Sequence, residues 1–103
     1  MASIVANFVK NSDGHIEGFG TVDSGNLNLN NVTAIAKDKQ HLGDPNYTFS
    51  KTTSAFSPPN NAWNAVIDSA PAGHTYACYA IAHLSDEQGV ITTIQSNGTQ
   101  LQI

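Results

Sequence analysis

Cys78 and the histidines near it are the residues whose types could do nucleophilic chemistry. A catalytic cysteine needs its thiolate form, an exposed site and a histidine within reach. His74 precedes Cys78 and His83 follows it, but the segment alternates like a strand, and alternation places His83 on the face opposite Cys78. A single cysteine also cannot form an internal disulfide. We therefore interpret Cys78 as a small buried core residue rather than a nucleophile.

The other residues that could do chemistry are scattered along the chain. The four histidines stand singly, at His15, His41, His74 and His83. None of them belongs to the His-x-x-x-His or Cys-x-x-Cys spacing that metal sites use. The aspartates stand mostly at turn signals, where their side chains bond the local backbone. We therefore expect no metal, no cofactor and no enzymatic activity.

The charge and hydropathy of the chain argue against two classes of partner. The net charge is −4, with four lysines and no arginine, whereas nucleic-acid binding requires a basic surface. No apolar run approaches the roughly 18 residues that a membrane-spanning helix needs. The first ten residues, MASIVANFVK, lack the basic start and long apolar middle of a signal peptide. We expect no nucleic acid, no membrane insertion and no signal peptide in this chain.

Turn signals rich in Gly, Pro, Asn and Asp divide the chain into short segments. Each segment alternates apolar and polar residues, which is the pattern of a half-buried strand. An Asn-Gly turn is expected to separate the last two segments. The expected strands cover residues 3–9, 15–22, 31–38, 47–52, 62–69, 75–83, 89–96 and 100–103. This rhythm predicts one all-β domain over residues 1–103, an antiparallel sandwich of about seven to eight strands or a small barrel, without a convincing helix.

Alternation also assigns the residues of the strand at 75–83 to its two faces. The inward face comprises Tyr76, Cys78, Ala80 and Ala82. Tyr79 and Ile81 then point outward, and Ile91 on the next strand is an apolar residue available to join them. We therefore predict an outward patch of Tyr79, Ile81 and Ile91 that contacts a protein partner or a second copy of the chain. The alternative is that the terminal QLQI segment or a loop covers this face.

The segment Gly73–Ala82, GHTYACYAIA, resembles the sixth strand of immunoglobulin-like and fibronectin type III domains. Those domains have a Pro/Gly corner, then a tyrosine whose hydroxyl bonds back to the corner, then alternating core residues. Pro71 and Tyr76 stand where the corner and that tyrosine would fall. The preceding segment, AWNAVIDSAPAG, is similar to the fifth strand and corner of bacterial and phage immunoglobulin-like modules. The resemblance spans Ala62–Ile94, about a third of the chain, and implies an immunoglobulin-like antiparallel β-sandwich with no disulfide.

The resemblance implies a non-catalytic structural or binding module. Modules of this kind decorate phage capsids or fibres, or serve in adhesion on bacterial cell surfaces. The resemblance therefore also implies a location on a virion surface or at the extracellular cell surface. The missing signal peptide and the single-domain length favour a phage structural protein or an excised domain. Since a fold does not by itself determine a function, these remain expectations.

A second function stays open, that of a carbohydrate-binding module. Aromatic rings stack on sugars and amide side chains bond their hydroxyl groups, and the loops at residues 41–47 and 56–63 carry both residue types. Trp63 lies in a strand pattern, however, which is more typical of a core residue. The candidate contacts for a surface glycan are Tyr47, Phe56, Trp63 and Asn64.

Overall fold

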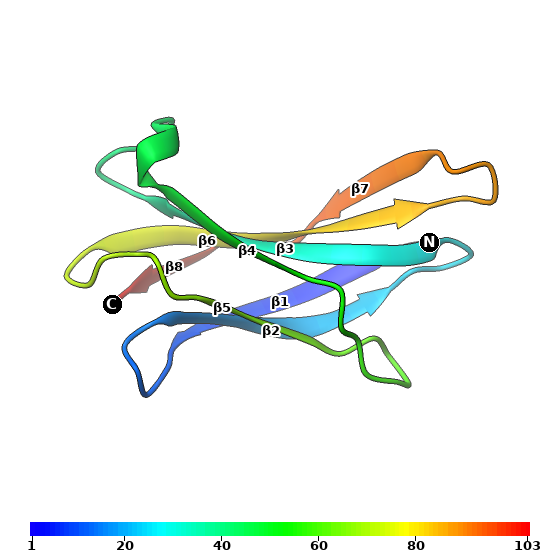
Figure 1. Ribbon diagram of the computed structural model, residues 1–103, viewed down its shortest axis with the longest axis horizontal. Coiled ribbons are helices and arrows are strands. Elements are labelled where there is room, and N and C mark those ends of the chain that lie inside the picture. Colours follow the sequence, from blue (N-terminus) through cyan, green and yellow to red (C-terminus); the bar gives the residue numbers. More distant parts are fainter.

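The protein consists of two antiparallel sheets that lie face to face (Figure 1). The computed structural model describes residues 1–103. The smaller sheet has the order β1-β2-β5, with β1 (Ser3–Lys10), β2 (Ile16–Asp23) and β5 (Trp63–Ile67). The larger sheet has the order β4-β3-β6-β7, and β8 also pairs with β6; its strands are β3 (Asn28–Asp38), β4 (Thr48–Thr53), β6 (Thr75–Ser85), β7 (Ile91–Gln95) and β8 (Thr99–Gln102). The expected all-β sandwich without a disulfide is confirmed, with eight strands.

The one helical element is η1 (Pro45–Tyr47), a 3-10 turn between β3 and β4. Asp44 caps it, because its carboxylate accepts a hydrogen bond from the Asn46 N–H at 2.9 Å. Proline at the first helical position suits such a turn, since its missing N–H would have no partner there. No helix in the structure has the length and apolar character that crossing a membrane requires.

β3 and β6 run further than the sequence predicts. β3 begins at Asn28 rather than at residue 31, and β6 ends at Ser85 rather than at residue 83. Their pairing passes through an irregularity between Leu29 and Asn31, beyond which Asn28 still pairs with Ser85. A bulge leaves one residue without a partner but does not end the ladder. The alternation of apolar and polar residues is therefore interrupted between Leu29 and Asn31, although β3 continues through this point.

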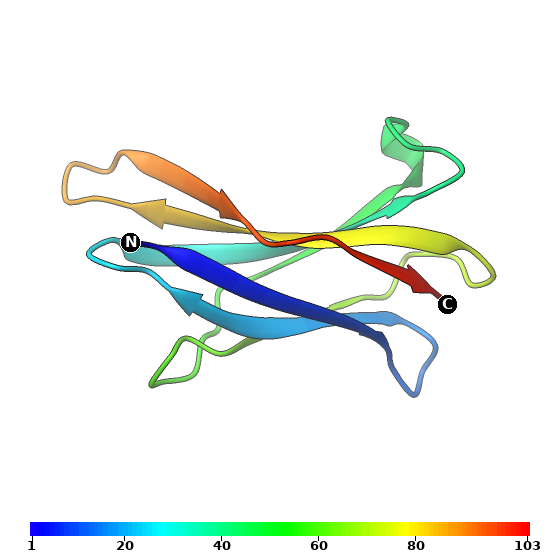
Figure 2. The ribbon, with the colours of Figure 1, turned by 180° about the vertical axis from the view of Figure 1, so that it is seen from behind.

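β7 and β8 occupy one edge of β6 in succession (Figure 2). β7 pairs with Ile81–Ser85 and β8 pairs with Thr75–Cys78. The expected reversing turn at Asn97-Gly98 is wrong, because the chain stays alongside β6 there. Ser96 holds it in place, since its N–H donates to the Ala80 carbonyl oxygen and its hydroxyl accepts from the Ala80 N–H, both at 2.9 Å.

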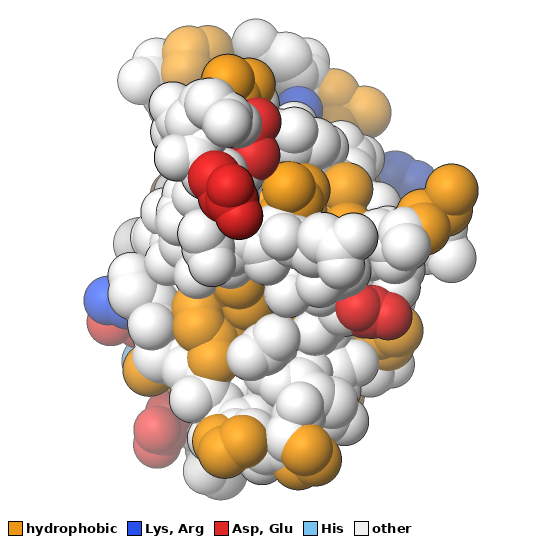
Figure 3. Space-filling view, turned by 90° about the vertical axis from the view of Figure 1, so that its right-hand side faces the viewer, with side chains coloured by type: hydrophobic (Ala, Val, Ile, Leu, Met, Phe, Trp, Pro, Cys, Tyr) orange, Lys and Arg blue, Asp and Glu red, His pale blue; other side chains and the backbone are white.

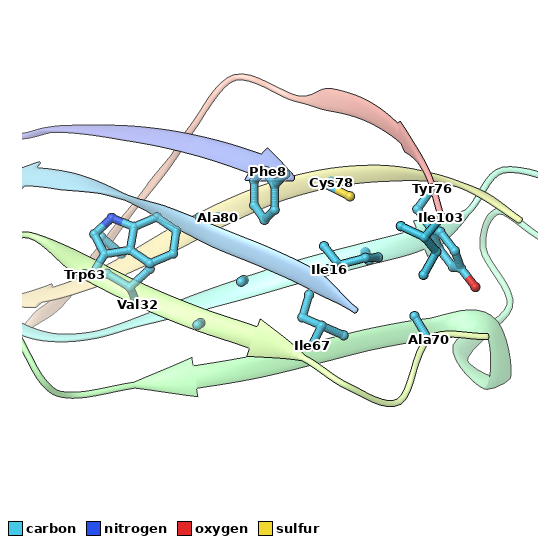
Figure 4. Close-up of a cluster of buried hydrophobic side chains, with 14 of the residues drawn as sticks. Phe8, Ile16, Val32, Trp63, Ile67, Ala70, Tyr76, Cys78, Ala80 and Ile103 are labelled. Carbon is cyan, nitrogen blue, oxygen red and sulfur yellow. The ribbon is translucent and has the colours of Figure 1, made fainter. Parts of the chain in front are cut away.

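The centre of the core combines small residues from the larger sheet with large residues from the smaller sheet (Figure 4). At the centre of β3 and β6, inward residues without solvent exposure are register partners: Val32 with Ala82, Ala34 with Ala80, and Ala36 with Cys78. The smaller sheet supplies the bulk, with Phe8, Ile16, Trp63 and Ile67. Small side chains opposite large ones let two sheets interdigitate at native density. The expected inward face of the strand at 75–83 is confirmed.

Tyr76 closes one end of this core. It is fully buried, and its hydroxyl donates to the Pro71 carbonyl oxygen at 2.6 Å, so the expected hydroxyl bond back to the corner is confirmed. Gly73 turns the corner with a φ of 86°, a left-handed conformation that glycine adopts without strain. Its N–H donates to the Ile103 carbonyl oxygen at 2.8 Å, and the Ile103 N–H donates to the His74 carbonyl oxygen at 3.1 Å. The corner therefore also holds the end of the last strand.

Two glycines of β2 allow β1 and the core to come close. A Cβ atom at Gly18 would lie 2.7 Å from Cε1 of the Phe8 ring. A Cβ atom at Gly20 would overlap the carbonyl group of Val5, which belongs to the backbone of β1. A flexible ring can shift by a few tenths of an ångström, but a backbone carbonyl that is part of a ladder cannot. Gly20 is therefore the position of the smaller sheet with the least tolerance for a side chain.

We expect Gly20→Ala to lower the free energy of unfolding by about 1–3 kcal/mol or more, because the added methyl group overpacks the β1 backbone. Urea denaturation followed by circular dichroism would measure the loss. Gly98→Ala is the matched control, since its Cβ atom would have its nearest neighbour, the Cys78 carbonyl oxygen, at 3.8 Å. The control should stay within about 0.5 kcal/mol of the unchanged protein. Equal stabilities of the two variants would contradict the close approach at Gly20.

Candidate functional site

The predicted interface residues lie on the outward side of the larger sheet. We call this surface the Tyr79 face, and it consists of the outward side chains of β3, β6 and β7: Thr33, Ile35, Lys37, Tyr79, Ile81, His83, Thr93 and Gln95. They share a side because register partners on neighbouring strands point the same way and alternate residues of one strand do too. The inward neighbours of these residues on β3 and β6 form the core.

The centre of the Tyr79 face is aromatic and apolar. Tyr79 pairs with Ile35 across the ladder, and Ile81 lies two residues further along the same strand. Both Tyr79 and Ile81 are half-buried. Lys37 extends over the ring of Tyr79, with its Nζ atom 5.6 Å from the ring centre, which is a cation–π distance. The structure thus brings two of the three predicted residues together and adds Ile35 to them.

Ile91, the third predicted residue, lies on the same side but apart from the other two. It pairs with Ser85 at the end of the β6–β7 hairpin. Four residues of extended strand separate Ser85 from Ile81, which is about 13 Å. Ile91 is 55 % exposed, and Val90 beside it is 60 % exposed. It forms an apolar tip of the hairpin rather than part of the centre.

The C-terminal segment does not cover the Tyr79 face. β8 extends the sheet beside β6, with pairs from Thr75 with Gln102 to Cys78 with Thr99. The alternative that QLQI lies over this surface is therefore wrong. The reason is that its backbone finds hydrogen-bond partners at the sheet edge, which a segment lying across the face would not have.

The charge distribution sets the Tyr79 face apart from the rest of the surface. The chain has eight acidic residues and four basic ones. Lys37 is the one charged side chain among the residues of the face, and none of the carboxylates lies there. Glu17 is on the other sheet, Asp38 points inward, and Asp86 and Glu87 lie in the β6–β7 hairpin. A second negatively charged protein can therefore approach this face with less repulsion than elsewhere.

Asn31 and His83 form a polar pair next to Ile81. They are register partners on β3 and β6. The Asn31 Oδ1 atom and the His83 Nδ1 atom are both covered and both lack a hydrogen-bond partner. Buried polar atoms are usually paired, so this pair retains unused hydrogen-bonding capacity at the edge of the apolar centre. The sequence pattern gives no sign of this pair, because Asn31 and His83 meet only through the register of β3 with β6.

The outward side of the smaller sheet carries a second group of apolar residues. Val5 and Val9 on β1 are 56 % and 42 % exposed, and Phe19 on β2 is 38 % exposed. Unlike the Tyr79 face, this side carries a carboxylate, that of Glu17, which accepts a hydrogen bond from the Asn64 amide. The sequence analysis did not single it out, although SIVANFV is apolar at both alternating sets of positions.

The four candidate sugar contacts do not form one surface. Trp63 is a core residue with 3 % exposure, so its ring offers no face to a ligand. Phe56, Trp63 and Asn64 border one hollow of about 350 Å³. Tyr47 lies at the other end of β4 and stacks on His41, with ring centres 3.8 Å apart. Phe56, Trp63 and Asn64 therefore lie together at one hollow, and Tyr47 lies apart from them.

A second hollow at the same end of the sandwich is polar. We call it the Asn60 hollow; it has a volume of about 370 Å³ and is lined by Thr21, Val22, Asp23, Ser24, Pro59, Asn60 and Asn61. Figure 3 looks onto this end, where neutral polar surface surrounds scattered hydrophobic and acidic side chains. Sequence reasoning missed the hollow because its two halves come from turns far apart in the chain.

Asp38 and His74 form a polar pair at the opposite end, beside Tyr76. Asp38 is 1 % exposed. Its carboxylate accepts the Gln40 N–H at 3.0 Å and lies 2.7 Å from Nδ1 of His74. Burial alone would raise the pKa of Asp38, but the hydrogen bonds from Gln40 and His74, with positive charge on His74 and His41, lower it overall. Burial chiefly, with the nearby Asp38 and Cys78, raises the pKa of Tyr76.

Cys78 lies within the core and has no solvent exposure. Burial raises the pKa of its thiol to about 11, so the reactive thiolate is scarce at neutral pH. His83 points out of the opposite side of β6, on the Tyr79 face. The interpretation of Cys78 as a buried core residue is confirmed.

Comparison with known proteins does not add a family to this description. No family model matches the sequence, and the searches of curated proteins and of solved structures find no significant similarity.

We expect Asp38 to make stability depend on pH in the acid range. Its pKa is lowered in the folded protein, so its ionised form stabilises the fold above its ordinary pKa of about 4, and this contribution disappears as the pH falls through the lower folded value. Asp38→Asn should be less stable than the unchanged protein at pH 6, and the difference should shrink below about pH 4. Urea denaturation across this range measures it. A stability gap for Asp38→Asn that stays constant across this pH range would show that the ionised Asp38 carboxylate does not stabilise the fold.

We also expect the Cys78 thiol to resist modification in the folded protein. Its burial and its raised pKa both suppress the thiolate. A disulfide reagent such as Ellman's reagent at pH 8 should react with it at the rate of unfolding, and immediately once urea unfolds the chain. Equal reaction rates for the folded and unfolded chain would show that the thiol is accessible.

Proposed function

We propose that the chain is an immunoglobulin-like module that binds another protein through the Tyr79 face. The assignment of the fold is supported by the strand order, in which β1, β2 and β5 face β3, β6 and β7. Those positions correspond to strands A, B, E and C, F, G of immunoglobulin-like sandwiches. The hydrogen bond from the Tyr76 hydroxyl to the Pro71 carbonyl oxygen is the corresponding tyrosine corner.

The observation that carries the function is the composition of the Tyr79 face. Its centre is Tyr79, Ile81 and Ile35, its surround is Thr, Gln and His with Lys37 extending over the Tyr79 ring, and no carboxylate lies on it. Interfaces likewise have aromatic residues enriched at the centre and a polar rim. The role is non-catalytic, since a flat sheet face recognises a partner by shape and does not surround a substrate.

The proposed setting is a phage particle or a bacterial cell surface, which places the protein on a virion or outside the cell. This part rests on analogy with other immunoglobulin-like modules. Within it, the first partner to test is a second copy of the chain. A net charge of −4 makes two copies repel at most orientations, and the Tyr79 face is the sheet surface on which that repulsion is weakest.

We expect gel filtration with light scattering to give a mass above the monomer's 10.9 kDa, rising with protein concentration. Tyr79→Ser removes the central aromatic contact and should raise the dissociation constant by about tenfold or more. Because Tyr79 is outside the core, the variant should keep the circular dichroism spectrum of the unchanged protein. Val5→Ser, a change at an exposed residue on the outward side of the other sheet, should leave the mass unchanged.

Two results would change the proposal. A monomer at every concentration would exclude self-association and leave a different protein as the partner. An equal loss of association in Val5→Ser and Tyr79→Ser would move the interface away from the Tyr79 face.

A further inference from the structure

The Asn60 hollow has the position and size of a ligand site. It lies at one end of the sandwich, between the end of β2 and the tip of the segment that leads into β5. Its volume of about 370 Å³ falls within the range of about 300–1,000 Å³ that small-molecule sites occupy. It is remote from the centre of the Tyr79 face, so it is a feature that the proposed interface does not use.

The walls of the hollow are held in place by hydrogen bonds of the protein itself. Val22 donates its N–H to the Asn60 carbonyl oxygen and accepts the Asn61 amide at its own carbonyl oxygen, both at 3.3 Å. At the base of the same loop, Ser57 and Ala62 exchange two backbone hydrogen bonds of 3.0 and 2.9 Å. A ligand would therefore find the loop already ordered, which lowers the entropy cost of binding.

The hydrogen-bonding groups that line the hollow are not used up by the fold. Asp23 uses one carboxylate oxygen, Oδ1, to accept the Gly25 N–H at 3.0 Å, which leaves Oδ2 without a partner. The side chains of Thr21, Ser24 and Asn60 form no hydrogen bond within the protein. Two hydroxyls, an amide and a carboxylate oxygen therefore belong to the lining of one hollow, and together they have capacity both to donate and to accept.

This set of groups selects the chemical class of the ligand. The hollow has no cationic side chain, so it does not suit an anion. No three His, Cys, Asp or Glu side chains of the protein come together, whereas calcium takes six to eight oxygen ligands, usually several of them carboxylates. Hydroxyl groups both donate and accept, and adjacent hydroxyls of a sugar can donate to Asp23 while accepting from the Asn60 amide. The lining thus matches a neutral polyhydroxylated ring.

We infer that the Asn60 hollow binds a neutral sugar unit of a glycan. The site differs from the one that the sequence suggested, because it uses Asp23, Ser24 and Asn60 instead of a stacking tryptophan. Trp63, the one tryptophan of the chain, borders the neighbouring hollow and is not part of the lining of this one.

The test is saturation-transfer NMR with lactose, maltotriose and N,N′-diacetylchitobiose as probes, each at about 10 mM, a concentration that fills most of a site whose dissociation constant is about 1 mM. At least one probe should receive saturation from the protein. Asn60→Ala and Asp23→Asn should each weaken its binding by about tenfold, since each removes a hydrogen bond, in the second case one to a charged group. Asp23→Asn keeps an amide oxygen for the Gly25 cap, so the fold is retained.

Asn97→Ala is the matched control, because Asn97 is an exposed asparagine outside the hollow. It should bind the same probe with unchanged affinity. The inference is overturned if none of the three sugars receives saturation. It is also overturned if a sugar binds but Asn60→Ala and Asp23→Asn bind it as well as the control does. Neither result depends on the oligomeric state, so the inference and the proposed interface fail or stand separately.

Discussion

The pairing of β3 with β6 is the constraint on which the other parts of the structure depend. At its centre, three register pairs present only Val, Ala and Cys side chains to the core. The smaller sheet can then insert Phe8, Trp63 and two isoleucines into the space that remains. Sheets in a sandwich pack at a separation of about 10 Å, and large residues on both inner faces would exceed it. The glycines of β2 also prevent crowding, because their missing side chains leave room for the Phe8 ring and for the β1 backbone.

The same pairing creates the Tyr79 face. Side chains of a strand alternate between its two sides, so every small residue that β6 turns inward is followed by one that it turns outward. A slip of one residue would exchange the two sets and put Tyr79 and Ile81 in the core. Tyr76 opposes such a slip, because its hydroxyl is bonded to Pro71 at the corner before the strand. The exposed surface and the buried core are thus two consequences of one register.

The two ends of the sandwich differ in chemistry. At one end, Asp38, His74 and Tyr76 form a polar cluster beside the corner, whose backbone is bonded to the last residue. At the other end, the loop before β5 docks on the end of β2 and leaves polar groups free around the Asn60 hollow. The Asn60 hollow and the Tyr79 face share no residue, so the proposed partner and the proposed ligand do not compete for one site.

The sequence by itself determined what depends on local pattern. Alternation and turn signals predicted seven to eight strands, the inward face of β6 and the burial of Cys78, and the resemblance to immunoglobulin-like strands predicted the Tyr76 bond to its corner. Pattern failed where backbone pairing overrides it: the bulge near Asn30 lengthens β3, and Ser96 keeps the chain beside β6 where Asn97-Gly98 suggested a reversal.

Only the tertiary structure decided which distant residues meet. It separated Tyr47 from Phe56 by the length of β4, and it placed Asp23 against Asn60 across two turns. It also decided that β8 extends the larger sheet and leaves the Tyr79 face open. The physical reason is that alternation describes one strand at a time, whereas a site is formed by the ladder hydrogen bonds and core contacts that bring several strands and loops together.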